Sequence, residues 1–256
     1  MKYGKFFLCI LVFFSIHWSA TQGKEANSVQ GVVTLYDGFK YIEDGYIKAK
    51  LKFKQKNGKK KEWDVQIFKS EGEALYVFEE HKHSPVLKIL YKNKNRDIYY
   101  QNTKNFRVYQ MLGDEKYENV LHTSFTYKDL SFYLFEVNYV SLILTKESYK
   151  GQNMVRLPFK PLDPNGYKKL VLYLNAKNFE PERLDFYGVK MEFLKSLKYK
   201  FATIKKIENK QASTTRFPAI METVDAKTYN VSTFQILELN KDIIPNKAFF
   251  SLQNLK

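Results

Sequence analysis

The sequence predicts a mainly β protein built on a long antiparallel sheet with a sparse helical cover, and three observations support this fold class. Apolar residues and lysines alternate strictly over residues 47–54, as in a strand with one buried face. Short apolar runs then follow at intervals of about 8–12 residues, separated by turn residues. The chain also holds 19 Tyr and 21 Phe but only 11 Gly and 7 Pro, which favours aromatic-rich strands over disorder.

The first residues have the layout of a secretory signal peptide. Lys2 and Lys5 precede the apolar run 6–16, and small and polar residues follow it. The run is too short for a membrane-spanning helix, which needs about 20 apolar residues. Cys9, the only cysteine, lies inside the run and not at the lipid-attachment position behind it. We therefore expect residues 1–23 to be a signal peptide, cut after Ala20 or Gly23, which leaves an exported, unanchored protein.

The remaining residues, 24–256, show no linker and no break in composition, so we expect a single domain. Without Lys2 and Lys5 the chain has 40 basic and 27 acidic residues, a net charge of +13. This surplus favours anionic partners such as phospholipid headgroups. Export makes nucleic acid the least expected of these partners.

The first half of this domain is predicted to be a helix followed by a meander. Apolar residues at helical spacing predict a short amphipathic helix over 25–42. Asn57-Gly58 indicates a hairpin, because both central positions of a type I′ turn favour positive φ. The predicted strands cover 47–54, 63–67, 74–78, 86–91, 97–100 and 106–109.

The second half begins with a segment, 111–149, that has no clean period. Thr126 is suited to cap a short helical turn within 123–133, and we expect this segment to lie over the sheet. The tail 245–250 is suited to one helical turn. The predicted strands cover 154–159, 170–174, 183–187, 190–194, 197–205, 219–224 and 229–239.

The sequence offers little that would support catalysis. It contains no G-x-S-x-G, no P-loop, no G-x-G-x-x-G and no H-E-x-x-H pattern. His81 and His83 form an H-x-H pair without enough neighbouring ligands for a metal, so we interpret it as an exposed hairpin tip. His122 stands alone and is interpreted as a structural residue. We therefore predict no enzyme activity, no metal and no cofactor.

The predicted strand 47–54 presents two contrasting faces. Its outer face carries Lys48, Lys50, Lys52 and Lys54, which either protect a solvated strand or dock to anionic lipid, at about 1 kcal/mol per basic residue. Its apolar face must be covered. A second sheet would give a sandwich, whereas helices inside a curved sheet would give an incomplete barrel. Because the candidate covers are small, part of a concave face could stay free for a ligand.

The segment Phe125-Thr126-Tyr127-Lys128-Asp129-Leu130 resembles the F-[ST]-Y-E-D-L signature of the outer-membrane lipoprotein-sorting proteins, the LolA-like periplasmic carriers, with Lys128 replacing the acidic residue. The similarity extends over most of residues 45–256, with motifs in matching order at 75–78, 86–90, 97–100, 170–181, 217–222, 227–228 and 243–249. The resemblance implies a curved antiparallel sheet that forms an incomplete half-barrel, covered by a few short helices and enclosing a cavity for lipid chains. It implies no enzyme activity and no cofactor.

These observations predict a periplasmic carrier for lipoprotein acyl chains or phospholipid, with an inner-membrane exporter and an anionic membrane surface as candidate partners. The predicted cavity lining comprises Leu51, Phe53, Val65, Ile67, Tyr76, Phe78, Phe125, Tyr127, Leu130 and Tyr173. Two alternatives stay open. These side chains could form the sealed core of an envelope scaffold or accessory protein beside a lipid exporter. An exported enzyme acting on carbohydrate or lipid would need clustered carboxylates or a histidine pair in a cleft.

Overall fold

A computed structural model of the chain describes residues 28–40, 44–80, 84–94, 96–103, 105–131, 139–149, 151–163 and 166–255. The predicted signal segment 1–23 lies outside the described residues, as do His81 and His83. No helix in the described part of the chain combines the length and apolar character needed to cross a membrane.

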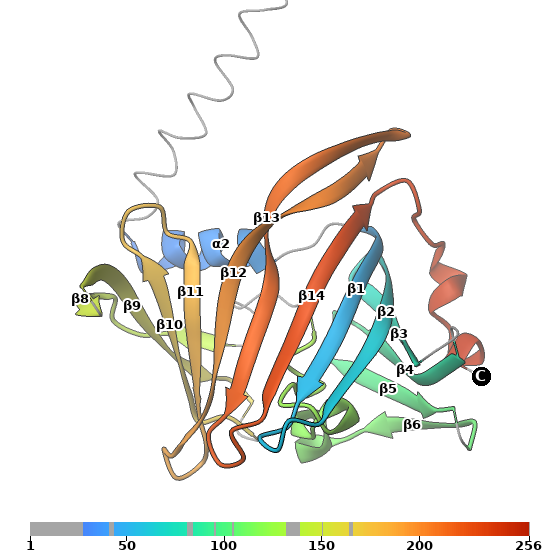
Figure 1. Cartoon of the computed structure of the whole chain (residues 1–256), viewed down its shortest axis with the longest axis horizontal. Helices are drawn as coiled ribbons and strands as arrows, with labels where there is room; N and C mark the ends of the chain where they lie inside the picture. Colours follow the sequence, from blue (N-terminus) through green and yellow to red (C-terminus); the bar gives the residue numbers. More distant parts are fainter. Residues whose placement is uncertain are drawn as a thin grey trace, which may run out of the picture.

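The described residues form one 14-stranded sheet that runs through the whole molecule (Figure 1). Its order is β6-β5-β4-β3-β2-β1-β14-β13-β12-β11-β10-β9-β7, with β8 also paired to β9. Neighbouring strands along this order are antiparallel, and a short parallel contact joins β12 to β14. The strands are β1 (Gly45–Lys54), β2 (Lys60–Ser70), β3 (Glu73–Glu80), β4 (Ser84–Lys92), β5 (Asp97–Asn102), β6 (Arg107–Met111), β7 (Tyr139–Ser141), β8 (Thr145–Tyr149), β9 (Gln152–Pro161), β10 (Lys169–Asn175), β11 (Pro181–Tyr187), β12 (Phe193–Glu208), β13 (Gln211–Asp225) and β14 (Val231–Asn240).

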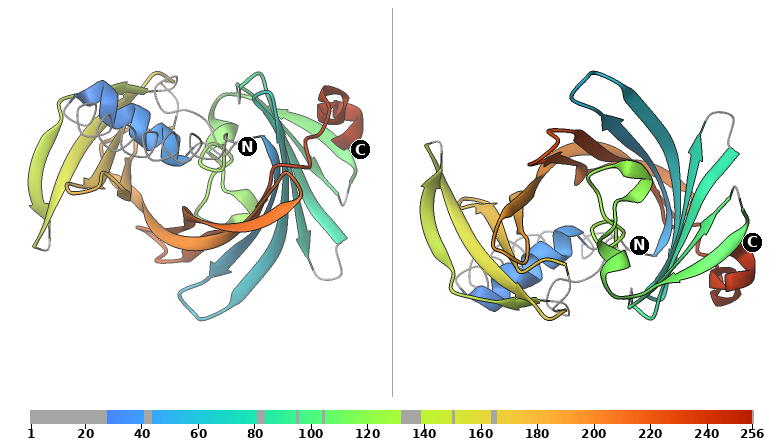
Figure 2. Two further views of the ribbon diagram at one scale, coloured as in Figure 1. Left: turned by 90° about the horizontal axis from the view of Figure 1, so that it is seen from above. Right: turned by 90° about the horizontal axis from the view of Figure 1, so that it is seen from below.

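The sheet curves strongly and stays open, with β6 and β7 at its two ends (Figure 2). Breaks in register between Lys48 and Ala49 of β1, and between Lys200 and Ala202 of β12, interrupt the pairings β1–β14 and β12–β13. Such bulges increase the twist and bend of a strand, so they help the sheet to wrap. The predicted fold class, an incomplete antiparallel barrel with few short helices, is confirmed.

Sequence alternation explains the strands that build the centre of the sheet. In β1 the apolar side chains at 47, 49, 51 and 53 are buried, and the lysines between them face outward. The predicted hairpin follows, because Gly58 adopts φ +88° and its N–H donates to the carbonyl of Gln55 at 2.9 Å. Only a residue without a side chain adopts this φ at little cost.

Two segments cover different halves of the concave face. Helix α2 (Val29–Lys40) lies inside the curve and contacts β7, β12 and β13, and the segment 112–131 lies beside β1–β5 (Figure 2). The helix begins at Ser28, whose Oγ accepts from the N–H of Gly31 at 3.0 Å and so satisfies one free donor of the first turn. Val32, Val33 and Tyr36 of α2 are buried in the main core.

The C-terminal tail covers part of the convex face. It forms the short 3-10 helices η4 (Lys247–Phe250) and η5 (Leu252–Leu255), where one helical turn was predicted. Phe250 and Leu255 pack on Leu75 and Leu90, which are outward-facing residues of β3 and β4. Strands β3 and β4 are therefore buried on both faces.

Two parts of the predicted strand pattern differ from the structure. The predicted strand 190–194 is mostly a turn: the Gly188 N–H donates to the Glu192 carbonyl, Met191 adopts φ +61°, and β12 starts only at Phe193. The short strands β7 and β8 were not predicted. Most of their residues are exposed or half-buried at the sheet edge, so they lack the apolar alternation that a half-buried strand shows.

Candidate functional site

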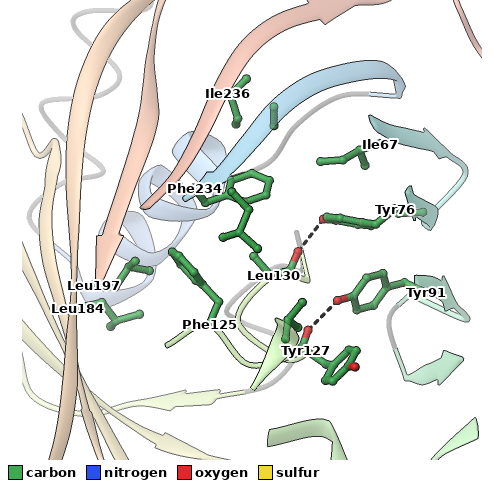
Figure 3. Packing of buried hydrophobic residues seen from close by; sticks show 14 of the residues in the cluster. Ile67, Tyr76, Tyr91, Phe125, Tyr127, Leu130, Leu184, Leu197, Phe234 and Ile236 are labelled. Carbon is green, nitrogen blue, oxygen red and sulfur yellow. Dashed lines mark hydrogen bonds between the residues drawn. The ribbon is translucent and has the colours of Figure 1, made fainter. Parts of the chain in front are cut away.

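Nine of the ten predicted lining residues meet on the concave face of the sheet. All except Tyr173 belong to one cluster of buried side chains that also contains Phe234 and Ile236 of β14. Figure 3 shows Tyr76 of the sheet pointing toward Leu130, and Phe125 on the side of Leu184 and Leu197. None of the nine is more than 8% exposed. In this structure the chain's own side chains fill the cluster.

Tyr173 lies elsewhere. Its neighbours in β10, Leu172 and Leu174, point into the concave cluster, so Tyr173 points to the convex face. It packs there with Met154 and Val171 in a separate cluster. The structure therefore does not bring Tyr173 together with the other nine residues.

The concave cluster is closed by residues 112–131, which we call the plug. It contains the 3-10 helices η1 (Gly113–Tyr117) and η2 (Val120–His122) and a turn at 126–130, but no strand of the sheet. The predicted capping role of Thr126 is confirmed, since its Oγ1 accepts from the Asp129 N–H at 3.1 Å. Phe125 contacts the ring of Phe234 edge-on, with ring centres 6.3 Å apart.

Two buried tyrosines of the sheet hold the plug through its backbone. The hydroxyl of Tyr76 donates to the carbonyl of Leu130 at 2.6 Å, and that of Tyr91 donates to the carbonyl of Tyr127 at 2.8 Å (Figure 3). Burial raises the pKa of both phenols well above the ordinary value, so both remain donors at neutral pH. On the other side, the N–H of Ser124 donates to Ser232 Oγ at 2.8 Å. These polar contacts fix the plug without a strand pairing.

A buried ion pair provides a further anchor. The ammonium group of Lys195, on β12, contacts the Asp129 carboxylate and donates to the Ser124 carbonyl at 2.8 Å. The two side chains are only 8% and 3% exposed. Asp129 also accepts from the Tyr167 hydroxyl and from the Thr126 N–H, each at 2.8 Å. An ion pair removed from water needs such additional hydrogen bonds to be tolerated.

The sequence did not reveal this ion pair. Asp129 stands inside the family-like hexapeptide, which marked the segment without indicating a partner. Lys195 lies 66 residues away and looks like any other lysine of the chain. The alternation of side chains along a strand predicts only that Lys195 shares a face with Leu197, which is buried in the concave cluster.

The predicted basic face is only partly basic. Lys48, Lys50, Lys52 and Lys54 do alternate with the buried residues of β1. However, Lys50 contacts Glu62 and lies 3.7 Å from Asp64, and its hydrogen bond lowers the pKa of Glu62. Lys54, Lys60 and Lys61, at the hairpin end of β1 and β2, have no acidic partner among the described residues. A hollow of about 600 Å³ lies there, lined by Lys52, Phe53, Lys54, Lys60, Lys61, Glu62, Glu80, Val231 and Thr233.

No metal centre is found in the part of the chain that the structure describes, where no three His, Cys, Asp or Glu side chains gather. His122 lies in η2 with an exposed side chain and φ +62°. The predicted His81–His83 tip lies outside the described residues.

Three solved structures share this architecture. A DUF1329 family protein from Desulfovibrio piger is 15% identical, with a TM-score of 0.72 over 88% of this chain and 96% of its own. A putative outer membrane lipoprotein-sorting protein domain from Vibrio parahaemolyticus is 18% identical, with a TM-score of 0.70 over 87% and 96%. A LolA superfamily protein from Nitrosomonas europaea is 17% identical, with a TM-score of 0.68 over 89% and 99%. These likenesses establish a LolA-like fold.

The sequence itself matches one family of proteins. A family whose description reads "uncharacterized protein" matches residues 71–256. None of the curated proteins compared with the chain matches it significantly.

Proposed function

The chain belongs to the family that matches residues 71–256 and has a LolA-like fold, and we propose that it is a non-enzymatic carrier of lipid acyl chains. The cargo would be a lipoprotein or a phospholipid, bound on the concave face. One observation carries the proposal: a contiguous apolar cluster from β1, β2, β3 and β14 is closed by a plug that is anchored by side-chain hydrogen bonds and an ion pair.

Exchange of the plug for an acyl chain sets a gain against a cost of the same order. About ten methylenes entering the cluster contribute about 8 kcal/mol. Exposing Val120, Phe125, Tyr127 and Leu130 of the plug costs about 1.5–3 kcal/mol for each side chain. The tyrosine hydrogen bonds contribute about 0.5–1.5 kcal/mol each. A carrier requires opposing terms of this kind, because its cargo must both enter and leave.

The proposal places the protein in the bacterial periplasm, after removal of residues 1–23. The lysines at 48, 50, 52 and 54 would meet an anionic membrane surface. Lys54, Lys60 and Lys61, which line the hollow, form no ion pair with any other described residue, so they would contribute most. An inner-membrane exporter is the partner that such a shuttle would need. Glutamine at positions 54, 60 and 61 should weaken binding to phosphatidylglycerol vesicles and leave acyl-chain binding unchanged.

The closed packing of the concave cluster favours one alternative, an envelope accessory protein without a cargo cavity. In that case the nine side chains are permanent core, and the plug never leaves. The two proposals differ in what happens when the plug is loosened. A carrier then binds cargo more tightly, whereas a scaffold only loses stability.

Titration with a fluorescent fatty acid tests the proposal. The wild-type protein should bind it and release it to unlabelled fatty acid. Tyr76→Phe and Tyr91→Phe, which each remove one plug hydrogen bond, should bind it more tightly. Tyr109→Phe is the matched control on an exposed tyrosine of β6 and should behave as wild type. Absence of binding in all four proteins, together with no lipid in a mass spectrum of the native protein, would refute the carrier function.

A further inference from the structure

A second cluster lies on the convex face of the sheet, away from the plug. Tyr173 of β10, Arg183 of β11 and Lys198 of β12 are register partners across three adjacent strands, so their side chains share one face. Leu172 and Leu174 point to the concave side, which places the three partners outside. None of these residues takes part in the proposed cargo site.

Arg183 is held in a fixed orientation in this cluster. Its guanidinium carbon lies 4.1 Å from the ring centre of Tyr173 and 4.5 Å from that of Tyr149, so two aromatic rings contact the group. Its Nε lies 3.1 Å from Asp185 Oδ1, yet this buried Nε makes no hydrogen bond of good geometry. Such stacking immobilises the planar fork before any ligand arrives, which lowers the entropic cost of binding.

A hollow of about 240 Å³ opens beside this arginine. It is lined by Tyr149, Gln152, Met154, Tyr173, Glu182, Arg183 and Lys198. Lys198 is exposed and forms no ion pair with any residue that the structure describes. The charge of Asp185 is already engaged by Arg183 and by the Ser196 hydroxyl. Lys198, the guanidinium of Arg183 with Asp185 as its partner, and two phenols therefore face one small space. Glu182 and Gln152 add acceptors at the same wall.

The opposite half of the sheet shows what an ordinary convex face of this protein looks like. There the outward residues Leu75 and Leu90 are sealed by Phe250 and Leu255 of the tail. Over β9–β11, the apolar residues Met154, Val171 and Tyr173 are instead bordered by charged side chains, and the hollow stays open.

We propose that this convex hollow binds the phosphate ester of a small polyol, either as a soluble molecule or as a phospholipid headgroup. Arg183 and Lys198 would hold the phosphate, because a guanidinium matches two of its oxygens and an ammonium supplies a point charge for a third. Glu182 and Gln152 accept from the neighbouring hydroxyls. The volume is below that of sites for drug-sized ligands, which suits a ligand of this size.

Calorimetric titration of the purified protein with glycerol 3-phosphate tests the site. We expect binding, at least about tenfold weaker in Arg183→Lys and in Lys198→Gln, because each loses a charge-assisted contact. Because Lys198 is exposed, its substitution should leave the fold intact. Arg216→Lys is the control: Arg216 also lies on a ring, that of Phe201 at 4.5 Å, but lines no part of this hollow, and its variant should bind as wild type.

A second arm separates the two sources of the phosphate. Vesicles of phosphatidylglycerol that bind in an Arg183-dependent manner, beside neutral phosphatidylcholine vesicles that do not, identify a headgroup. Binding of glycerol 3-phosphate alone identifies a soluble ester. Binding of neither, or binding that Arg183→Lys and Lys198→Gln leave unchanged, overturns the proposal. Fatty-acid binding on the concave face is measured in a separate titration. Arg183→Lys and Lys198→Gln should both bind the fatty acid as the wild-type protein does.

Discussion

The buried ion pair between Asp129 and Lys195 gives the sharpest prediction about how the plug is held. Lys195→Met keeps most of the aliphatic side chain, including its place near the rings of Tyr167 and Phe186. It removes the ammonium group and with it the hydrogen bond to the Ser124 carbonyl. Asp129 is then left as a buried carboxylate, 3% exposed, without its counter-charge.

Breaking a buried pair on one side costs about 3–5 kcal/mol. Asp129 keeps its hydrogen bonds from Tyr167 and from the Thr126 N–H, so the lower end, about 3 kcal/mol, applies. For a chain of this size, a urea dependence of about 2–3 kcal/mol per molar converts this loss into a fall of roughly 1 M in the unfolding midpoint. Asp129→Asn/Lys195→Met should recover most of it, because no uncompensated charge then remains.

Urea unfolding followed by circular dichroism measures these shifts, and amide exchange of residues 116–130 locates them. Lys200→Met is the matched control, since Lys200 sits on the same strand in an exposed pair with Glu222 at 3.2 Å. Its cost should stay below about 1 kcal/mol. A Lys195→Met midpoint equal to that of Lys200→Met, or a double variant no more stable than Lys195→Met, would refute the assigned role of the pair.

Three further predictions concern stability. Burial lowers the pKa of Lys69 from 10.5 to about 8. Between these two pH values the unfolded chain binds more protons than the native state, so the free energy of unfolding of the wild type rises with pH. Lys69→Met should therefore be more stable than wild type at pH 7, with the difference shrinking by about 2 kcal/mol by pH 10 in pH-dependent urea titrations. Phe250→Ala should cost about 3–5 kcal/mol because this side chain is 1% exposed, whereas Leu252→Ala, at 43% exposed, should cost under about 1 kcal/mol by the same assay. Gly45→Ala should cost about 1–3 kcal/mol in thermal unfolding, since φ is +143° and the new Cβ would lie 2.6 Å from the Asn240 carbonyl oxygen; Gly58→Ala meets no atom within 4 Å and should cost less.

The regular half of this fold follows from its sequence because alternation is a local signal. Residues 47–54 predict β1 and its buried face directly, since burial of every second side chain leaves a period of two. The turn after β1 is equally local, as Gly58 provides a φ that other residues resist. The same reasoning fails at 190–194, where apolar residues at 191 and 193 suggest alternation but belong to a turn and a strand start.

The candidate site could be predicted only in its apolar part. The alternation of apolar and polar residues in their strands predicts that Leu51, Ile67 and Phe78 are buried, and the structure places all three in one cluster. Tyr173 alternates just as well, but periodicity alone does not say which face of a strand is concave. The Asp129–Lys195 contact joins a loop to a strand far along the chain, and no local pattern encodes it. The free charge of Lys54 and the neutralised charge of Lys50 likewise depend on which acids lie across the strand.

A reversible disulfide between the plug and the sheet tests most directly whether the plug leaves and an acyl chain takes its place. Ser124 of the plug and Ser232 of β14 are buried neighbours joined by a 2.8 Å hydrogen bond. Ser124→Cys/Ser232→Cys, made in a Cys9→Ser background, is designed to form one disulfide that locks the plug, and mass spectrometry verifies the cross-link before binding is compared. Binding of a fluorescent fatty acid should be at least about tenfold weaker in the oxidised protein and return on reduction. Equal binding in both states, or none in either, would contradict a mobile plug over a cargo site.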